Sequence, residues 1–141
     1  MPEEIILDPD SLSEEAREPF IGEVVWAKYP CDCEVCSRGQ FGQDQLHIQI
    51  QPIDGVYSAT QHEWYRPTKT ARSAYGMLVK ALAKLGMKKI KPSDLVGKVF
   101  EWHYTEYETP GGDKKYVWIP SRLLSDAEVS TLKKAMERGT L

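Results

Sequence analysis

The chain has 141 residues, the size of one domain, and its hydrophobic and charged fractions of 41% and 28% are ordinary for a soluble globular protein. This composition excludes a collagen-like or wholly disordered chain, and no apolar run approaches the roughly 18 residues that a membrane-spanning helix needs. The first ten residues, MPEEIILDPD, are acidic where a signal peptide is basic, and three cysteines are too few for a disulfide scaffold. We therefore expect a cytoplasmic protein in a reducing compartment, with no membrane partner.

The net charge of −3 is distributed unevenly along the chain. Residues 1–20 contain seven acids and one base, a balance of −6, whereas Arg66–Lys98 contains nine bases and one acid, a balance of +8. Such a local positive field attracts polyanions, although a run of lysines is also common on a solvated helix face.

Residues 1–19, interrupted by Pro9 and Pro19, are expected to form an acidic arm. The β-branched and aromatic content of Phe20–Tyr29 predicts a strand, and a long glycine- and cysteine-containing loop follows over Pro30–Asp44. Gln45–Ile53 alternates apolar and polar residues, which is typical of a half-buried strand with an open polar face.

Asp54-Gly55 is a two-residue hairpin signal, so the partner strand is expected at Val56–Tyr65. An apolar stripe of helical period predicts a helix over Thr70–Leu85, with Thr70 as its N-cap. Two further strands are expected at Lys98–Tyr107 and Lys114–Leu123, on either side of a glycine-rich turn. Ser125 and Glu128 have the spacing of a capping box at the start of a C-terminal helix that reaches Arg138.

Five strands with a helix between the third and fourth is the order of a mainly β, OB-type Greek-key barrel. In this order, the segments SAYGMLVKALAKLGMKK, PSDLVGKVFEWHY and KYVWIP resemble OB-fold single-stranded nucleic-acid-binding proteins of phage and archaeal type. The resemblance covers about three quarters of the chain. It implies an OB-fold barrel domain at residues 20–124, between the arm at residues 1–19 and the C-terminal helix at residues 125–141 that the residue patterns predict.

In OB-fold proteins the ligand usually lies across strands two and three, flanked by the loops between strands one and two and between strands four and five. Here the loops would be Pro30–Asp44 and Thr109–Lys115. The segment HEWYRPTKTAR interleaves aromatic and basic residues, the combination that stacks on bases and follows phosphates. The predicted nucleic-acid-binding residues are Arg38, Phe41, His47, Gln49, Trp64, Arg66, Lys69, Arg72, Lys114 and Lys115.

Aromatic residues are also common in the core of a small barrel. Trp64 and Tyr65 point to opposite sides of a strand, so we expect one of them to be exposed. The remaining large aromatics are assigned to the core: Trp26, Phe100, Trp102, Tyr104 and Trp118.

Cys31, Cys33 and Cys36 form a C-x-C-x₂-C cluster whose thiolates could converge on one soft metal ion. A structural zinc site needs a fourth ligand, for which His47 or His62 is available, and His62 is the candidate if the third strand runs back beside the loop. Ordinary thiols or a local disulfide explain the cluster equally well.

The sequence lacks the P-loop, G-x-G-x-x-G, H-E-x-x-H and G-x-S-x-G motifs, so we do not expect an enzyme. The first hypothesis is a largely sequence-independent single-stranded DNA or RNA binding protein that acts in DNA replication, recombination or repair. The second is a protein–protein adaptor on the same barrel, with a structural zinc loop. Its partners would bind the acidic arm or the C-terminal helix through Val129, Leu132 and Met136.

Overall fold

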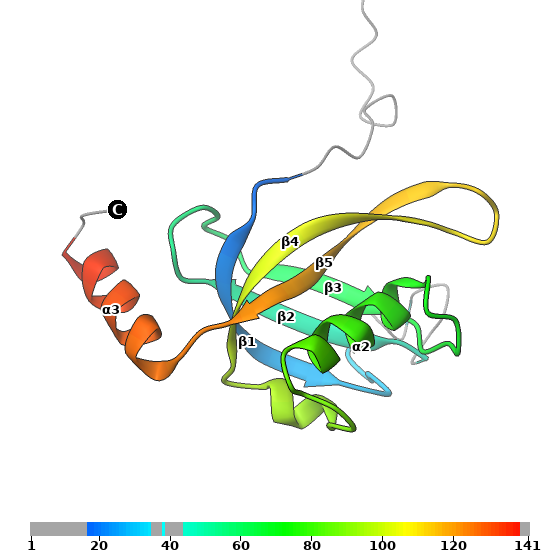
Figure 1. The fold of residues 1–141 in the computed structure, drawn as a ribbon, viewed down its shortest axis with the longest axis horizontal. Helices are drawn as coiled ribbons and strands as arrows, with labels where there is room; N and C mark the ends of the chain where they lie inside the picture. The colour runs from blue at the N-terminus through cyan, green and yellow to red at the C-terminus, as the bar shows by residue number, and fades with distance from the viewer. Residues whose placement is uncertain (1–16, 35–37, 39–43, 139–141) are drawn as a thin grey trace, which may run out of the picture.

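A computed structural model describes residues 17–34, 38 and 44–138 of the chain (Figure 1). The predicted acidic arm, except its last three residues, and the predicted site residues Cys36 and Phe41 lie outside these ranges. The strands are β1 (Phe20–Lys28), β2 (Leu46–Pro52), β3 (Gln61–Tyr65), β4 (Val99–Glu108) and β5 (Lys114–Leu123). The helices are α2 (Ala74–Lys84), the short 3₁₀ helix η2 (Pro92–Leu95) and α3 (Asp126–Glu137).

The five strands form one antiparallel sheet in the order β3-β2-β1-β4-β5. This confirms the mainly β prediction with a helix between the third and fourth strands and a second helix at the C-terminal end. The predicted strand at Lys114–Leu123 and the capping box of α3, in which Ser125 and Glu128 bond to each other's backbone N–H groups, are also confirmed.

The core lies on the side of the sheet that α2 covers. Leu46, Ile48 and Ile50 of β2 point into it, as their alternation predicts, and Leu78 and Leu82 of α2 cover one side of it. The largest side chains there are fully buried: Trp102, Trp118, Tyr65, Phe20 and Phe100. Tyr104 packs against this core while remaining partly exposed.

The assignment of Trp26 to the core is wrong. Alternation buries Phe20 and Val24, and an unbroken strand would bury Trp26 as well. A β-bulge between Val24 and Trp26 adds one residue to β1, so that Val24 pairs with Ile50 but Trp26 pairs with Gln49. The extra residue reverses the phase of the strand, turning Trp26 outward and Ala27 toward the core.

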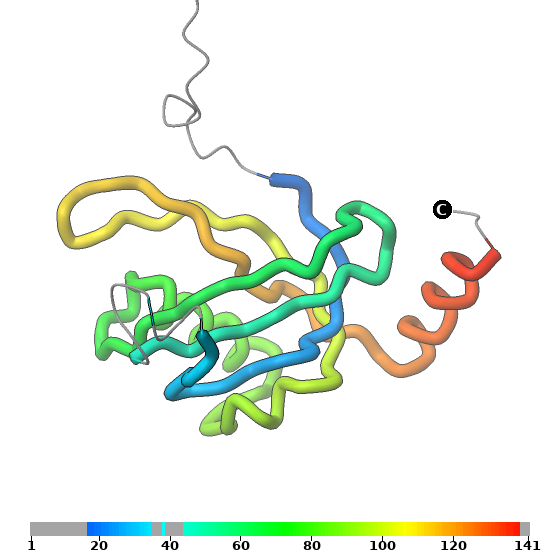
Figure 2. The backbone as a smooth tube through the Cα atoms, turned by 180° about the vertical axis from the view of Figure 1, so that it is seen from behind, coloured from blue at the N-terminus to red at the C-terminus, as the bar shows by residue number. Residues whose placement is uncertain are grey.

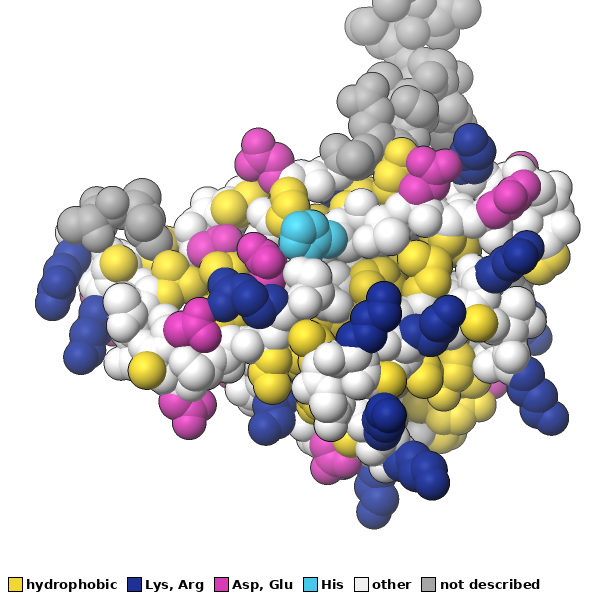
Figure 3. All heavy atoms as spheres, in the orientation of Figure 1, with side chains coloured by type: hydrophobic (Ala, Val, Ile, Leu, Met, Phe, Trp, Pro, Cys, Tyr) yellow, Lys and Arg dark blue, Asp and Glu magenta, His cyan; other side chains and the backbone are white. Residues whose placement is uncertain are grey.

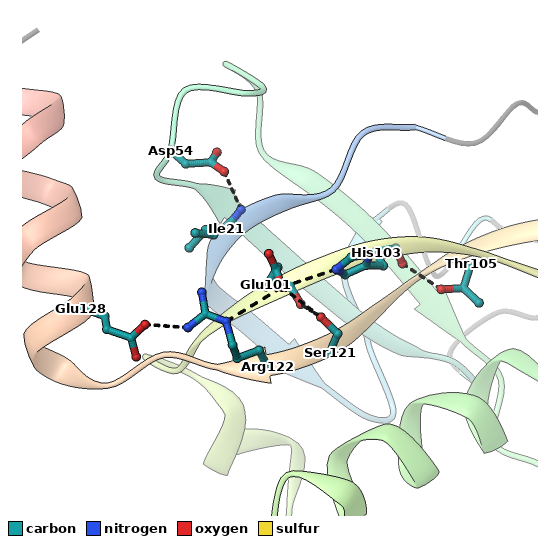
Figure 4. Close-up of polar contacts among 8 residues, drawn as sticks. All are labelled: Ile21, Asp54, Glu101, His103, Thr105, Ser121, Arg122 and Glu128. Carbon is teal, nitrogen blue, oxygen red and sulfur yellow. Dashed lines mark hydrogen bonds and ion pairs between the residues drawn. The ribbon is translucent and has the colours of Figure 1, made fainter. Parts of the chain in front are cut away.

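The predicted Asp54-Gly55 hairpin is also wrong, because β3 begins only at Gln61. The carboxylate of Asp54 accepts hydrogen bonds from the backbone N–H of Ile21 at 2.8 Å and of Val56 at 3.2 Å (Figure 4). Residues 53–60 therefore form a loop between β2 and β3 instead of a two-residue turn, and Asp54 bonds this loop to β1.

The helix α2 begins later than predicted. Its N-cap is Ser73, whose hydroxyl accepts a hydrogen bond from the Gly76 N–H, rather than Thr70. The carbonyl of Thr70 instead accepts hydrogen bonds from the backbone N–H and the hydroxyl of Ser73, which forms a turn before the helix.

Two side chains link the sheet edges β3 and β5, between which no backbone pairing is present in the described residues. The hydroxyl of Tyr65 donates a hydrogen bond to the Trp118 carbonyl. The Trp118 N–H donates to the carboxylate of Glu63 at 2.8 Å. The sheet therefore has five strands and is open. Its two edges are linked only where Tyr65 and Glu63 of β3 bond to the backbone of Trp118 in β5, as far as the described residues show.

The C-terminal helix α3 lies at one end of the sheet, apart from α2 (Figures 1 and 2). None of its residues is fully buried, although Lys133 forms an ion pair with Glu23 of β1 at 3.3 Å. In the described ranges, no helix has the length and apolar character required to cross a membrane.

Candidate functional site

The outward surface of β1, β2 and β3 carries a cluster of aromatic and polar side chains, here called the open face. The backbone register pairs Trp26 with Gln49, Gln49 with His62, and His47 with Trp64. Since paired residues of antiparallel strands point to the same side of a sheet, these side chains share one surface. The open face consists of Trp26, Lys28, His47, Gln49, Gln51, His62 and Trp64.

Trp26 and Trp64 are the large aromatic residues of the open face, and 38% and 36% of their surfaces are exposed. The ring of Trp64 is stacked on His47, with centroids 4.8 Å apart and planes 15° from parallel. Two large flat rings are thus partly exposed on one sheet surface, one in the register position opposite Gln49 and the other opposite His47.

His47 is the buried member of the open face, with only 2% of its surface exposed. Its Nδ1 atom lies 3.6 Å from the sulfur of Cys31 and 3.6 Å from the sulfur of Cys33. The three potential ligand atoms lie within 4.8 Å of one another, close enough to hold a metal ion. Cys31 is fully buried and Cys33 is half-buried, and no disulfide joins either of them to another described residue.

These distances match tetrahedral coordination. Zinc bonds of about 2.3 Å to sulfur and about 2.05 Å to nitrogen, at a tetrahedral angle, place sulfur and nitrogen about 3.6 Å apart. Two thiols cannot both donate well to the single lone pair of one imidazole nitrogen. The convergence of both sulfurs on Nδ1 is compatible with a metal ion held by all three atoms.

His62 was the preferred histidine ligand in the sequence analysis, and the structure places it elsewhere. Its Nδ1 atom lies 3.0 Å from Nε2 of His47, the ring nitrogen that faces away from the two sulfurs. Metal-bound histidines commonly use their second nitrogen in this way, to bond to a neighbouring group that orients the ring. Among the described residues, His47 rather than His62 therefore groups with Cys31 and Cys33, and His62 lies behind it.

Burial lowers the pKa of His47 below its ordinary value, and the neighbouring His62 contributes to the same shift. Both causes oppose a positive charge on the ring. A neutral imidazole has the free lone pair that a metal ion requires.

Of the predicted basic residues, Arg66 follows β3 two residues after Trp64 and forms an ion pair with Asp44 at 3.5 Å. Lys69 and Arg72 are exposed in the connection between β3 and α2. Arg38 forms an ion pair with Glu34 in the loop that contains the cysteines. These cations lie on the segments that follow β1 and β3 in the chain.

Lys114 and Lys115 belong to a different part of the fold. They lie at the start of β5, where they pair with Glu108 and Tyr107 of β4 in the long hairpin. Lys114 also approaches Glu106 at 3.7 Å.

A polar network covers the outer surface of β4 and β5 (Figure 4). Arg122 contacts Glu101 at 3.9 Å and the α3 residue Glu128 at 2.6 Å, while His103 lies 3.5 Å from Glu101. The ion pair of Arg122 with Glu128 joins α3 to the sheet. The charged side chains of this network are thus paired with one another.

A second surface feature is an apolar groove of ≈ 530 Å³ between α2 and the segment containing η2. Tyr29 and Leu46 contribute to it from the sheet, and Lys88, Lys89 and Lys91 from the segment after α2. Basic side chains are visible around this part of the molecule in Figure 3. Because Leu46 points away from His47 on the same strand, the groove and the open face lie on opposite sides of the sheet.

Sequence reasoning missed the exposure of Trp26, and it left open whether His47 or His62 lies beside the cysteines. The bulge that exposes Trp26 has no signal in the hydrophobic pattern. Comparison of the chain with protein-family models, curated proteins and solved structures found no match.

Proposed function

We propose that this protein binds single-stranded DNA or RNA on the open face, largely without sequence preference, and acts in DNA replication, recombination or repair. The observation that carries the proposal is the exposure of Trp26 and Trp64 on one surface of β1, β2 and β3. Indole rings stack on the faces of unpaired bases, which a duplex conceals. Such a surface selects single strands over duplexes.

The spacing of the two tryptophans suits an extended strand. They lie two strands apart and are offset by one same-face position along β2. With about 4.8 Å between strands and about 6.8 Å between same-face positions, their backbones are about 12 Å apart. This separation allows bases one or two nucleotides apart to stack on Trp26 and Trp64, while Gln49 can bond to base edges.

Basic residues near this surface would hold the phosphates. Lys69 and Arg72 follow Trp64 closely in the chain and are exposed, and Lys28 lies on the open face itself. Phosphate contacts of this kind supply affinity that is independent of sequence and weakens as salt is added. Lys28 also bonds to Asp32 at 2.7 Å, so part of its charge is compensated.

The OB-type Greek-key barrel is part of the same proposal. It is supported by the observed strand order and by the position of α2 between β3 and β4, both of which are compatible with an OB-fold. The bonds of Tyr65 and Glu63 to Trp118 bring the two sheet edges together where a barrel would close. In an OB-fold the outer surface of strands two and three carries the ligand, which is the position of Trp64 and His47 here.

We further propose zinc as the ion that Cys31, Cys33 and His47 hold, in a structural role. Two thiolates and an imidazole are three of the four ligands that a structural zinc site needs, and they neutralise its charge; the predicted ligand Cys36 lies outside the described residues. An ion here would attach the segment after β1 to β2 at the border of the open face. Metal analysis of the purified protein is expected to give about one zinc per chain, and less than about 0.2 would refute this part of the proposal.

The binding function can be tested by fluorescence anisotropy with labelled dT oligonucleotides and a duplex of equal length, at two salt concentrations. We expect Trp26→Ala and Trp64→Ala each to weaken single-strand binding by about 5- to 150-fold, the effect of losing one stacked base. Trp64→Phe should retain most of the affinity. Val79→Ala, a truncation of an exposed apolar side chain on α2, serves as the control.

The basic residues require a separate measurement. Lys69→Ala combined with Arg72→Ala should reduce the slope of log affinity against log salt by about 1.4 to 1.8, since single strands and duplexes give about 0.7 and 0.9 per contact. Equal affinity for single strands and duplex, or no binding at about 50 mM salt, would reject the nucleic-acid function.

The adaptor hypothesis is favoured by one observation, the position of α3. Val129, Leu132 and Met136 are only half-buried on a helix that contributes no residue to the core. If Trp26→Ala and Trp64→Ala together leave oligonucleotide affinity unchanged, the adaptor becomes the better explanation. The partner would then bind α3 or the acidic arm.

A further inference from the structure

His47 connects the metal ligands to the open face. Its Nδ1 atom faces the sulfurs of Cys31 and Cys33, each at 3.6 Å, and its Nε2 atom lies 3.0 Å from Nδ1 of His62. The flat side of the same ring is stacked on Trp64 at 4.8 Å. One buried imidazole therefore contacts the thiols, the supporting histidine and the exposed indole.

We propose that the metal ion controls nucleic-acid affinity by holding the His47 ring, against which Trp64 is packed. This inference rests on the nucleic-acid function proposed above and assigns it a form of regulation. With the ion bound, the lone pair of Nδ1 is directed at the metal, and the proton resides on Nε2, from which it is donated to His62. Both ring nitrogens of His47 then have a partner, the metal at Nδ1 and His62 at Nε2, so the orientation of the ring is determined.

The ordered ring has a direct consequence for Trp64. The two rings are within 15° of parallel, so a fixed imidazole fixes the plane of the indole. His62 also stacks near this pair, with its centroid 5.2 Å from His47 and 5.9 Å from Trp64. The indole is therefore held beside both imidazoles, and the exposed part of Trp64 is presented to a base in a defined orientation.

Removal of the ion leaves two thiols and one nitrogen lone pair, so only one sulfur can donate to Nδ1. The second ring torsion of histidine has a broad, roughly two-fold profile, and the imidazole can then change orientation. Trp64 loses its fixed support and must be ordered by the ligand, which reduces affinity. The loss cannot exceed that of Trp64→Ala, because the indole itself is still present.

Trp26 provides a matched comparison. It lies on the same open face and is exposed to a similar extent, but it belongs to β1 and is stacked on none of the described aromatic rings. If the ion acts through Trp64, removing it should weaken binding equally in the wild type and in Trp26→Ala. In Trp64→Ala, the same treatment should have almost no effect.

The experiment measures the affinity of the full chain for a dT oligonucleotide, zinc-loaded and after removal of zinc with a chelator under reducing conditions. The wild type and the variants Trp64→Ala and Trp26→Ala are compared. We expect chelation to weaken binding by about 5-fold or more in the wild type and in Trp26→Ala, and by less than about 2-fold in Trp64→Ala. Far-ultraviolet circular dichroism identifies any variant that unfolds without metal.

Two results would overturn the coupling. One is an unchanged affinity in the chelated wild type, and the other is an equal loss in Trp64→Ala, which would show a general effect of the metal on the fold. Failure of the zinc-loaded wild type to bind any oligonucleotide would instead reject the proposed function.

A second readout tests the coupling without nucleic acid. Addition of Co²⁺ to the metal-free chain should produce a sulfur-to-cobalt absorption band and a change in the near-ultraviolet circular dichroism of tryptophan. Trp64→Phe should retain the absorption band and lose most of the tryptophan signal. His62→Gln should weaken Co²⁺ binding by about 10- to 100-fold, as expected for a residue that orients a ligand. A tryptophan signal that persists in Trp64→Phe, or unchanged Co²⁺ affinity in His62→Gln, would refute the arrangement.

Discussion

The contact between β3 and β5 gives the most direct test of the fold, through the substitution Tyr65→Phe. The Tyr65 ring is completely buried, and its hydroxyl donates a hydrogen bond to the Trp118 carbonyl of the opposite sheet edge. The substitution removes the hydroxyl while preserving the packing of the ring. It therefore tests the link between the sheet edges apart from the hydrophobic core.

The magnitude follows from burial. Loss of a neutral buried hydrogen bond costs about 1 kcal/mol, and the carbonyl left without its partner raises this to about 1–3 kcal/mol. For a domain of this size, 1 kcal/mol changes the melting temperature by about 3–5 °C. A loss of about 2 kcal/mol would lower it by about 6–10 °C.

The same bond predicts a pH dependence. Burial, with a further contribution from the charge of Glu63, raises the pKa of Tyr65 well above its ordinary value of 10.0. Below pH 10 the hydroxyl is protonated in both the folded and the unfolded chain. Above pH 10 the unfolded chain loses this proton and the folded chain retains it, so the stability that Tyr65 contributes decreases by about 1.4 kcal/mol per pH unit.

Urea denaturation at pH 8 and near pH 11 measures both effects. The wild type should exceed Tyr65→Phe in free energy of unfolding at pH 8, and the difference should shrink at the higher pH. Tyr116→Phe is the control, because its hydroxyl is at the surface and 3.4 Å from Glu106. If Tyr65→Phe costs no more than this control, or its cost is independent of pH, the hydrogen bond does not join the sheet edges as described.

Two further predictions concern the helices. Gly76→Ala should improve helix propensity by about 1 kcal/mol, but the new Cβ would clash with the Thr70 backbone carbonyl. We therefore expect a net loss of about 1–3 kcal/mol in the free energy of unfolding, measured by heat or urea. A gain in stability would contradict the described turn. For α3, the Ser125 backbone N–H, and next the Arg122 side chain, lower the pKa of Glu128 below its ordinary value of 4.5. The contribution of Glu128 to the cap is thus complete above pH 4.5 and is lost as pH falls through the lowered pKa. The helical circular dichroism of the wild type should therefore decrease more steeply on acidification than that of Glu128→Gln. Identical profiles would contradict this role of Glu128.

Local patterns determined much of the secondary structure. The alternation in β2, the glycine-rich turn before β5 and the capping box at Ser125 and Glu128 each act between residues close in sequence, and the structure agrees with all three. The start of α2 could not be read in this way, because Thr70 and Ser73 are both good caps and the hydrogen bonds between them decide which one is used.

For the candidate site as well, the residue types could be recognised in the sequence, but the contacts between distant residues could not. The cysteine spacing and the aromatic–basic segment around Trp64 were visible as residue types, and they directed attention to the surface of β2 and β3. The ligand role of His47 was left open, because the choice between His47 and His62 depends on which ring nitrogen faces the loop. That orientation follows from the register of β1, β2 and β3, which brings residues far apart in sequence together.

The sequence by itself determined the residue types of this protein and the order of its elements, because both depend on short-range hydrogen bonding and hydrophobic period. Only the tertiary structure decided that Trp26 points outward, since one bulged residue reverses the phase of a strand and its position depends on pairing with β2. Only the tertiary structure brought Cys31, Cys33 and His47 together, because convergence of three side chains is a property of packed strands.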